Sequence, residues 1–237
     1  MCGRYTQTNT LEDLQRRFGK VLEKLSAIFK PSYNIAPGQP AAVVTGGEEG
    51  GVTAMRWGLV PSWAKEPGVG YKMINARAET VTEKPAYKRL VTRKRCLVPA
   101  DGFYEWRKPQ GKGPKIPTYF TRKDGDLFTM AGLWDVWEGE EEPLETFTVI
   151  TTEANDLVRK THHRMPVILP PEAEQAWLDS EQIPKEALGD YLTSFDADLM
   201  KAVTVSSDVN SPANNSPACI VPVEAPPTLE QGDLFSL

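Results

Sequence analysis

The chain has 237 residues, 40% of them hydrophobic and 25% charged, so it is long enough to bury the core of one large domain or two small ones. No basic segment followed by an apolar run opens it, and no stretch approaches the length of a membrane span, so we expect neither a signal peptide nor a membrane segment. The three cysteines are scattered and lack CxxC spacing: Cys2, Cys96 and Cys219. This pattern argues against a disulfide framework and against a zinc site, and it predicts a cytoplasmic protein with no metal and no cofactor.

The net charge of −5 taken alone argues against a nucleic-acid binder, but the charges are unevenly distributed. From Lys84 to Arg95 there are six basic residues and no acidic one, and from Asp124 to Glu145 eight acidic residues and no basic one. An acidic chain of this kind can still present one basic face to phosphates, although such runs are more often solvated surface.

At the N-terminus, Cys2 follows Met1, and removal of the methionine would give Cys2 a free α-amine beside its thiol. Unperturbed, these two groups titrate near pH ~8 and ~8.5, so each is partly reactive at neutral pH. A 1,2-aminothiol can condense with an aldehyde and close a thiazolidine ring, or it can act as an N-terminal nucleophile on an amide. Cys2 alone does not decide between these chemistries and an ordinary small residue.

The predicted elements then follow in chain order. Thr10 is a helix N-cap and Gly19 a helix stop, with Leu11, Leu14 and Phe18 at helical spacing between them. Two β-rich runs flank a glycine-rich turn and predict a hairpin, 41–45 with 52–57. The other predicted strands are 95–99, 102–107, 118–122, 127–137 and 147–151. The other predicted helices are 21–29, 154–160, 171–178 and 184–193.

Strands outnumber helices and do not alternate regularly with them. This pattern favours an α+β protein with a mostly antiparallel sheet and peripheral helices over a doubly wound fold. We expect a domain over residues 1–223 and a flexible tail over 224–237, because the last stretch is proline-rich and then polar.

Several short strings are rich in residues that can bind or react. Trp57 and Trp63 flank glycine and proline, a pattern that suits a ligand as well as it suits core packing. Asn75 opens a predicted loop that also carries Arg77 and Glu79, and the simplest interpretation of those two charges is an ion pair with each other.

A carboxylate and two histidines are the remaining candidates for acid–base chemistry. Glu105 lies in an aromatic strand, where burial would raise its pKa and suit it to shuttle protons. Strand alternation places it on one face with Phe103 and Arg107. His162 and His163 are the only histidines, and because adjacent side chains seldom point the same way we expect at most one to be catalytic. Metal binding is the weaker alternative there.

Six short strings, in this order along the chain, resemble the SOS-response-associated peptidase (SRAP) family of abasic-site processing proteins. They are Met-Cys-Gly-Arg, Asn-Ile-Ala-Pro-Gly with Trp-Gly-Leu-Val-Pro, Asn-Ala-Arg-Ala-Glu-Thr, Asp-Gly-Phe-Tyr-Glu-Trp and His-His-Arg-Met-Pro. The resemblance covers nearly everything but the tail. It implies a single SRAP-type domain with a barrel-like, mostly antiparallel core that binds abasic sites in single-stranded DNA or at single-strand/duplex junctions.

The resemblance also implies the catalytic roles. Cys2 would capture the deoxyribose aldehyde as a thiazolidine, forming a DNA–protein crosslink that shields the lesion. Asn75 would orient that terminus, Glu105 would shuttle protons, and His162 would act as general acid toward the sugar ring oxygen. The peptidase activity in the family's name we interpret chiefly as exposure of its own Cys2, by removal of Met1.

Contacts with DNA are carried over from the family in the same way. The expected residues are Arg4, Arg77 and Arg164 on phosphates, Trp63 and Pro37 near exposed bases, and Thr151 at the lesion. Two positions depart from the pattern of relatives. Ala64 stands where some have a second wedging tryptophan, which predicts either a weaker grip on DNA or more reliance on charge. His163 stands where many have Asp, which could change the tuning of His162.

The tail ends in a Gln-x-x-Leu-Phe pattern that resembles the peptide by which bacterial proteins dock on the replicative sliding clamp. Gln231, Leu234 and Phe235 would make that contact, or the apolar pair would fold back on the domain. We expect a monomer that remains in the cytoplasm and associates with the nucleoid at damaged DNA.

Two other functions remain open at this point. A class II glutamine amidotransferase also exposes Cys-Gly after methionine removal and uses an asparagine for the oxyanion, but no synthetase partner domain follows here. A binding module could instead recognise damaged DNA without covalent chemistry, and substitution of Cys2 would separate it from a crosslinking protein.

Overall fold

The computed structural model describes residues 2–109, 113–139, 142–179 and 183–224. The strands are β1 (Tyr5–Gln7), β2 (Ser32–Ile35), β3 (Pro40–Thr45), β4 (Gly51–Trp57), β5 (Asn75–Arg77), β6 (Arg95–Ala100), β7 (Gly102–Arg107), β8 (Ile116–Arg122), β9 (Phe128–Trp137), β10 (Leu144–Glu153), β11 (Arg164–Pro166), β12 (Ile168–Leu169) and β13 (Met200–Thr204). The α-helices are α1 (Leu11–Phe18), α2 (Glu23–Ser26), α3 (Asp156–Arg159), α4 (Pro171–Leu178) and α5 (Leu188–Tyr191). Short 3-10 helices include η1 (Pro67–Lys72), η2 (Ala78–Thr80) and η3 (Lys185–Ala187).

Five strands close into a barrel, because the pairings run β10–β4, β4–β3, β3–β6, β6–β9 and β9–β10. All are antiparallel except β10–β4. Beyond its pairing with β4, β10 also pairs in parallel with β5 and antiparallel with β11. It is therefore the strand that brings β5 and β11, and the polar residues they carry, to one end of the barrel.

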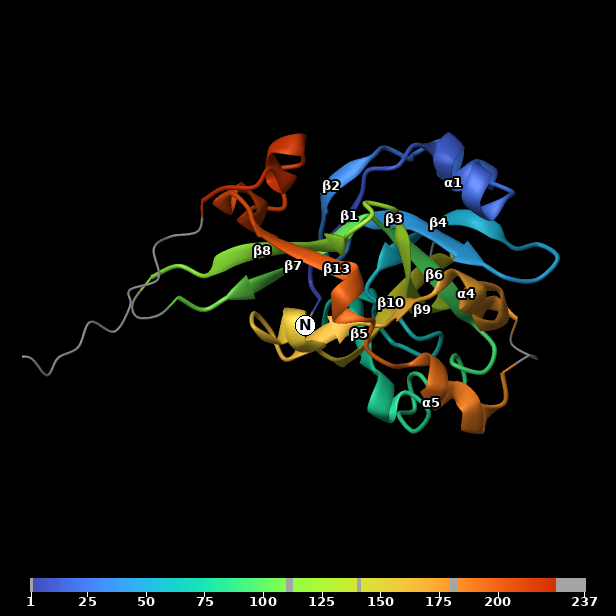
Figure 1. Ribbon diagram of the computed structural model, residues 1–237. Coiled ribbons are helices and arrows are strands. Elements are labelled where there is room, and N and C mark those ends of the chain that lie inside the picture. Colours follow the sequence, from blue (N-terminus) through green and yellow to red (C-terminus); the bar gives the residue numbers. More distant parts are fainter. Residues whose placement is uncertain (1, 110–112, 140–141, 180–182, 225–237) are drawn as a thin grey trace, which may run out of the picture.

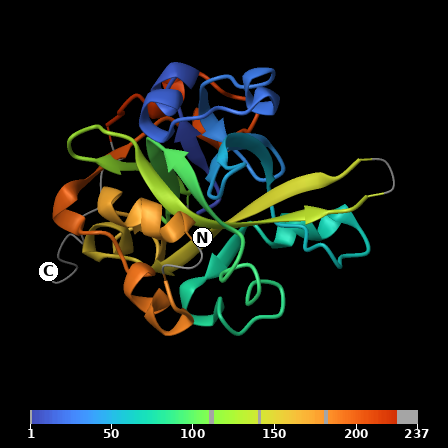
Figure 2. The same ribbon diagram turned by 90° about the vertical axis from the view of Figure 1, so that its right-hand side faces the viewer.

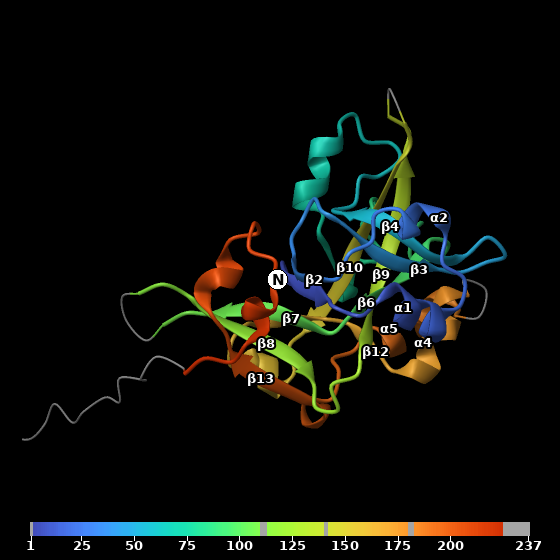
Figure 3. The ribbon, with the colours of Figure 1, turned by 90° about the horizontal axis from the view of Figure 1, so that it is seen from above.

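A second, antiparallel sheet has the order β13-β8-β7-β1-β2 and lies beside the barrel (Figure 1). The N-terminal strand β1 is inside this sheet, between β7 and β2. In the view from above, the N-terminus lies where the sheet meets the barrel (Figure 3). Cys2 is thereby held at the junction of the two β-structures.

Side-chain alternation fills two hydrophobic cores. Along β3, Val43 packs in a core that spans the barrel interior and the second sheet, whereas Ala42 and Val44 pack in another core under the helices. Because both faces of β3 are buried from Ala41 to Val44, that stretch is apolar without interruption. Along β7, Phe103 belongs to the first core, and Tyr104 packs on the opposite face against the C-terminal segment.

The predicted α+β class and the barrel-like, mostly antiparallel core are confirmed. The predicted helix 11–18 and the hairpin of β3 and β4 also form as expected. Three helices are shorter than predicted, namely α2, α3 and α5. The start of the first is lost because Val21 forms a β-bridge with Val52 and so leaves the helix.

The segment 75–80 was expected to be a loop, and that prediction is wrong. It forms β5, whose residues pair with Val149, Ile150 and Thr151, followed by η2. Its short sequence carries no strand signal of its own, and the partner strand β10 supplies the pairing.

Two further points concern the rest of the chain. No helix within the described residues is long and apolar enough to cross a membrane. The tail from 225 onward, including Gln231, Leu234 and Phe235, lies outside the described residues, so the domain boundary and the clamp contact stay predictions.

Candidate active site

Cys2 lies in the interior, three residues before β1 begins at Tyr5. Tyr5 is paired with Ile35 on one side and Phe103 on the other, which fixes the chain that leads to Cys2. The thiol is fully buried, and desolvation together with the nearby Glu105 carboxylate raises the pKa of Cys2 to about 12. At neutral pH the thiol therefore stays protonated until a neighbouring base removes its proton.

Asn75, the first residue of β5, holds the backbone of Cys2. Its Nδ2 donates a hydrogen bond to the carbonyl oxygen of Cys2 over 2.8 Å. Its Oδ1 is buried and has no hydrogen-bond partner among the described residues. A buried acceptor in this position is costly unless a donor reaches it, and so it is the feature most suggestive of a ligand or a free amine.

Glu105 projects from β7 on the same face as Phe103, as strand alternation predicts, and is 4% exposed. Burial raises the pKa of its carboxyl group. A carboxyl group whose pKa is raised above its usual range can both accept and donate a proton more readily.

His162 follows α3 and approaches Glu105, with 3.9 Å between Nδ1 and Oε1. The backbone N–H of Arg164 donates to His162 Nδ1 over 3.0 Å, and the neutral tautomer that accepts this bond carries its proton on Nε2. Burial lowers the pKa of His162, which favours this neutral form. His163 is exposed, and its ring packs against that of His162, with the centroids 4.4 Å apart and the ring planes tilted by 30°.

Arg164 and Thr151 lie beside this centre but are held by other protein groups. Arg164 makes a bidentate ion pair with Glu79 at 2.5 and 3.0 Å, and also donates to the carbonyl oxygen of Thr151. This pair lowers the pKa of Glu79. The expected ion pair between Arg77 and Glu79 is therefore wrong, because β11 brings Arg164 to the carboxylate while Arg77 stays exposed.

The remaining predicted DNA contacts fall into an exposed and a buried group. Trp63 is 68% exposed and Arg77 is exposed at the end of β5, whereas Pro37 is half-buried in the turn after β2. Arg4 is in the interior, where its guanidinium donates to Asn34 Oδ1 at 2.6 Å and to the Val209 carbonyl oxygen at 2.7 Å. Arg4 thus joins β1 and β2 to the C-terminal segment.

One exposed aromatic residue beside Pro37 was not singled out from the sequence. Tyr71 is 66% exposed, and its ring lies against Gly38 so closely that a Cβ there would come within 2.9 Å of it. Gly38 also has φ +87°, a conformation that glycine adopts readily. No pattern around Tyr71 marks it, because its position depends on the fold of the segment between β4 and β5.

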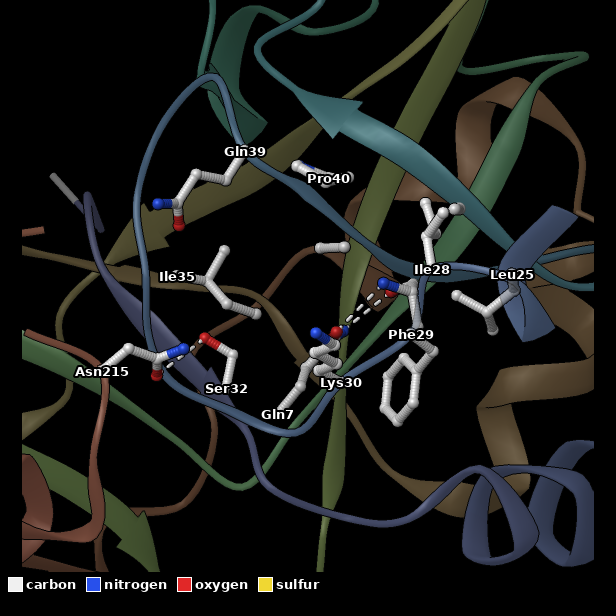
Figure 4. Close-up of a pocket in the computed structure, with 13 residues that line it drawn as sticks. Gln7, Leu25, Ile28, Phe29, Lys30, Ser32, Ile35, Gln39, Pro40 and Asn215 are labelled. Atoms are coloured by element: carbon white, nitrogen blue, oxygen red, sulfur yellow. Dashed lines mark hydrogen bonds between the residues drawn. The ribbon is translucent and has the colours of Figure 1, made fainter. Parts of the chain in front are cut away.

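A separate pocket of about 250 Å³ lies between α2, β2 and β3 (Figure 4). It contains none of the predicted site residues. Gln7 at its base uses its amide to bond Ala42 and Pro99, and so ties β1 to β3 and β6. Within the described ranges no cluster of three or more His, Cys, Asp or Glu side chains could hold a metal ion.

The site thus combines the buried thiol of Cys2, the Asn75 amide, the Glu105 carboxyl group of raised pKa and the His162 imidazole.

The chain is similar to known abasic site processing proteins. It is similar to the abasic site processing proteins YoqW of Bacillus subtilis, with 44% identity over 93% of this chain and 99% of the relative, and YoaM, with 45% identity over 91% and 96%. The abasic site processing protein HMCES of Gallus gallus is 37% identical over 83% of this chain and 67% of its own length.

Solved structures resemble the fold. A protein of Bacteroides thetaiotaomicron superposes with a TM-score of 0.85 at 30% identity, covering 94% of this chain and all of its own. One from Bordetella bronchiseptica reaches 0.72 at 27% identity, covering 86% and 100%. The family model described as "SOS response associated peptidase (SRAP)" matches residues 1–212, and the chain belongs to this family of abasic-site processing proteins.

Proposed function

We propose that this protein crosslinks itself to abasic sites in single-stranded DNA, or at single-strand/duplex junctions, through a thiazolidine formed by Cys2 after removal of Met1. The proposal rests first on Asn75, whose Nδ2 donates to the carbonyl oxygen of Cys2 and whose buried Oδ1 accepts no hydrogen bond from the described residues. A free α-amine on Cys2 would be a suitable donor to that acceptor. The family's abasic-site processing gives the lesion as substrate.

The chemistry balances with one molecule of water lost. The amine of Cys2 adds to the aldehyde of the ring-opened deoxyribose, and water leaves as the imine forms. The sulfur then adds to the imine carbon, which makes the C–S bond, and the thiol proton ends on the ring nitrogen. Because burial holds the thiol pKa high, Glu105 accepts that proton from sulfur and passes it on.

His162 acts before these steps. As an imidazolium it donates the Nε2 proton to the sugar ring oxygen and opens the hemiacetal, and because burial lowers the pKa of the ring, it gives up that proton readily and returns to the neutral form. Arg77 would contact phosphate, with Trp63 and Pro37 near bases. Arg4, Thr151 and Arg164 would have to reach DNA from positions where protein groups already hold them, so we propose that they act chiefly by shaping the site.

The test is intact mass spectrometry after incubation with a single-stranded oligonucleotide carrying one abasic site, without borohydride, for wild type and Cys2→Ala. We expect an adduct that survives denaturation in the wild type only, and Cys96→Ala serves as the matched control because Cys96 is equally buried elsewhere. No adduct from protein shown to have lost Met1 would refute the proposal and favour amide hydrolysis. Binding without an adduct would favour a non-covalent damage sensor.

A further inference from the structure

The basic run from Lys84 to Arg95 includes successive helical turns with an apolar and a basic side. The amides of Lys88, Val91 and Lys94 bond the carbonyl oxygens four residues earlier. Leu90 and Val91 are buried in the core under the helices, whereas Arg89 and Arg93, also four residues apart, are exposed. Residues at this spacing lie on one face of a helix, so the two guanidinium groups form one cationic ridge.

That ridge borders an exposed tryptophan. A hollow of about 190 Å³ lies between the segment after β4 and these turns, and we call it the tryptophan notch, lined by Ser62, Trp63, Arg89, Arg93, Lys94 and Asp135. Figure 2 shows the two segments, in cyan and in green-blue, on the side of the molecule to the right of and below the N-terminus. A large aromatic surface and two cations therefore share one small hollow.

The single acid in the notch is already neutralised. Asp135 is 4% exposed, receives Lys94 Nζ at 2.8 Å, and accepts the backbone N–H of Ser62 at 2.8 Å. This network fixes the loop that carries Trp63 against the basic turns. Arg89 and Arg93 make no ion pair within the described part of the chain, so their charge remains available to an anion.

The notch is also connected to the candidate active site. Tyr87, on the inner side of the same turns, donates from its hydroxyl to the backbone carbonyl of Asn75 over 3.4 Å. Arg77, two residues after Asn75 in β5, is exposed. Exposed cations are thus carried by β5, next to the candidate site, and by the basic turns that Tyr87 ties to it.

We infer that the tryptophan notch binds a nucleotide of the same DNA strand outside the lesion, with its base stacked on Trp63 and its phosphates on Arg89 and Arg93. The inference rests on the proposed function and adds the strand's further course to it. Stacking on an indole requires an unpaired base, so the notch selects single-stranded DNA. Guanidinium groups match phosphate oxygens in charge and geometry, which fits a backbone contact that reads no sequence.

The test uses Arg89→Ala/Arg93→Ala in a Cys2→Ala background, so that equilibrium binding is measured without crosslinking. Fluorescence anisotropy at several salt concentrations gives the affinity for single-stranded abasic oligonucleotides extended on the 5′ side, on the 3′ side, on both sides or on neither. The matched control is Lys123→Ala/Lys201→Ala, which removes two exposed positive charges near β8 and β13.

We expect the arginine variant to lose affinity about tenfold for oligonucleotides extended on one side, with the salt slope reduced by about 1.4 for two lost phosphate contacts. The unextended oligonucleotide should bind both proteins equally, and the lysine control should match the parent throughout. Equal loss in the two double variants, or no loss in the arginine variant, would overturn the notch. The proposed crosslinking is tested separately: it is refuted if the protein with an intact Cys2 forms no adduct with the unextended oligonucleotide.

Discussion

The centre around Cys2 and the tryptophan notch differ in almost every physical respect. Cys2 and Glu105 are almost fully buried, their pKa values are shifted by burial, and Asn75 holds the terminus. In the notch, Trp63 is 68% exposed and the two arginines extend into solvent. Under the proposed function, chemistry and affinity would lie on different parts of the molecule, so substitutions should separate them.

The difference also indicates what each region contributes to folding. A buried carboxyl group with a raised pKa lowers the free energy of unfolding at neutral pH, whereas exposed tryptophan and arginine side chains contribute little to it. The interior centre is thus the region where function should cost stability, and the notch the region where function should leave stability unchanged.

The largest expected effect is that of Glu105→Gln. Loss of the proton shuttle should slow crosslinking by about 10²–10⁴-fold while DNA binding persists. Because the folded pKa of Glu105 is raised, its ionisation opposes folding as pH rises. The free energy of unfolding of the variant, compared with that of the wild type, should therefore be more favourable at pH 7 than at pH 4. Single-turnover kinetics and thermal melts at both pH values test this.

Glu153→Gln, at the exposed end of β10, is the control for Glu105→Gln and should change neither quantity. An equal loss of rate in the two variants, or a loss of rate matched by a loss of folding, would show that Glu105 has no specific part in proton transfer.

Arg164→Ala should lower the free energy of unfolding by about 1–3 kcal/mol, because it removes a bidentate pair and a bond to a buried carbonyl oxygen. Arg77→Ala, an exposed neighbour on β5, should change it by less than about 0.5 kcal/mol. Urea denaturation measures both. Similar values for the two would contradict a structural role for Arg164.

Trp63→Ala should weaken binding to single-stranded DNA by about 1–3 kcal/mol, the usual contribution of a base stacked on an aromatic ring. Its thermal stability should match the wild type, since the side chain is mostly in solvent. Trp63→Tyr should restore most of the affinity in the same titration. Equal affinity of the alanine variant and the wild type would remove Trp63 from the DNA-binding surface.

The smallest effect expected is that of Glu79→Gln. Pairing with Arg164 lowers the folded pKa of Glu79, so the pair stabilises the protein above the unfolded pKa, near 4.3, and loses this contribution as pH falls through the lower folded value. The side chain is 47% exposed, so the difference at pH 7 should be at most about 1 kcal/mol and should vanish in acid. A difference that grows in acid would contradict this origin.

Local patterns in the sequence were sufficient for much of the fold. Thr10 and Gly19 mark α1 because capping is decided within a few residues, and the alternation along β7 correctly puts Glu105 with Phe103. Long-range pairing was not accessible in this way. Arg164 meets Glu79 only because β10 aligns β5 and β11, and nothing near either residue signals the other.

The same distinction applies to the site. A resemblance of short strings predicts Cys2, Asn75, Glu105 and His162 as site residues, and their proximity depends on four separate elements that the fold brings together. The burial of Arg4 could not be predicted, because its partner Asn34 and the Val209 carbonyl come from distant segments. The association of Trp63 with the basic run likewise depends on Asp135, in β9.

The position of β1 inside its sheet has a consequence for the order of events during synthesis. One neighbour of β1, β2, is made early, but Tyr5 also pairs with Phe103 in β7, and β13, which completes the sheet, is made later still. Domains fold as units once their parts have emerged, so Cys2 stays accessible on the growing chain long after it leaves the ribosome. If a cellular aminopeptidase rather than the protein itself removes Met1, the nascent chain is the form it would meet, before Cys2 becomes buried.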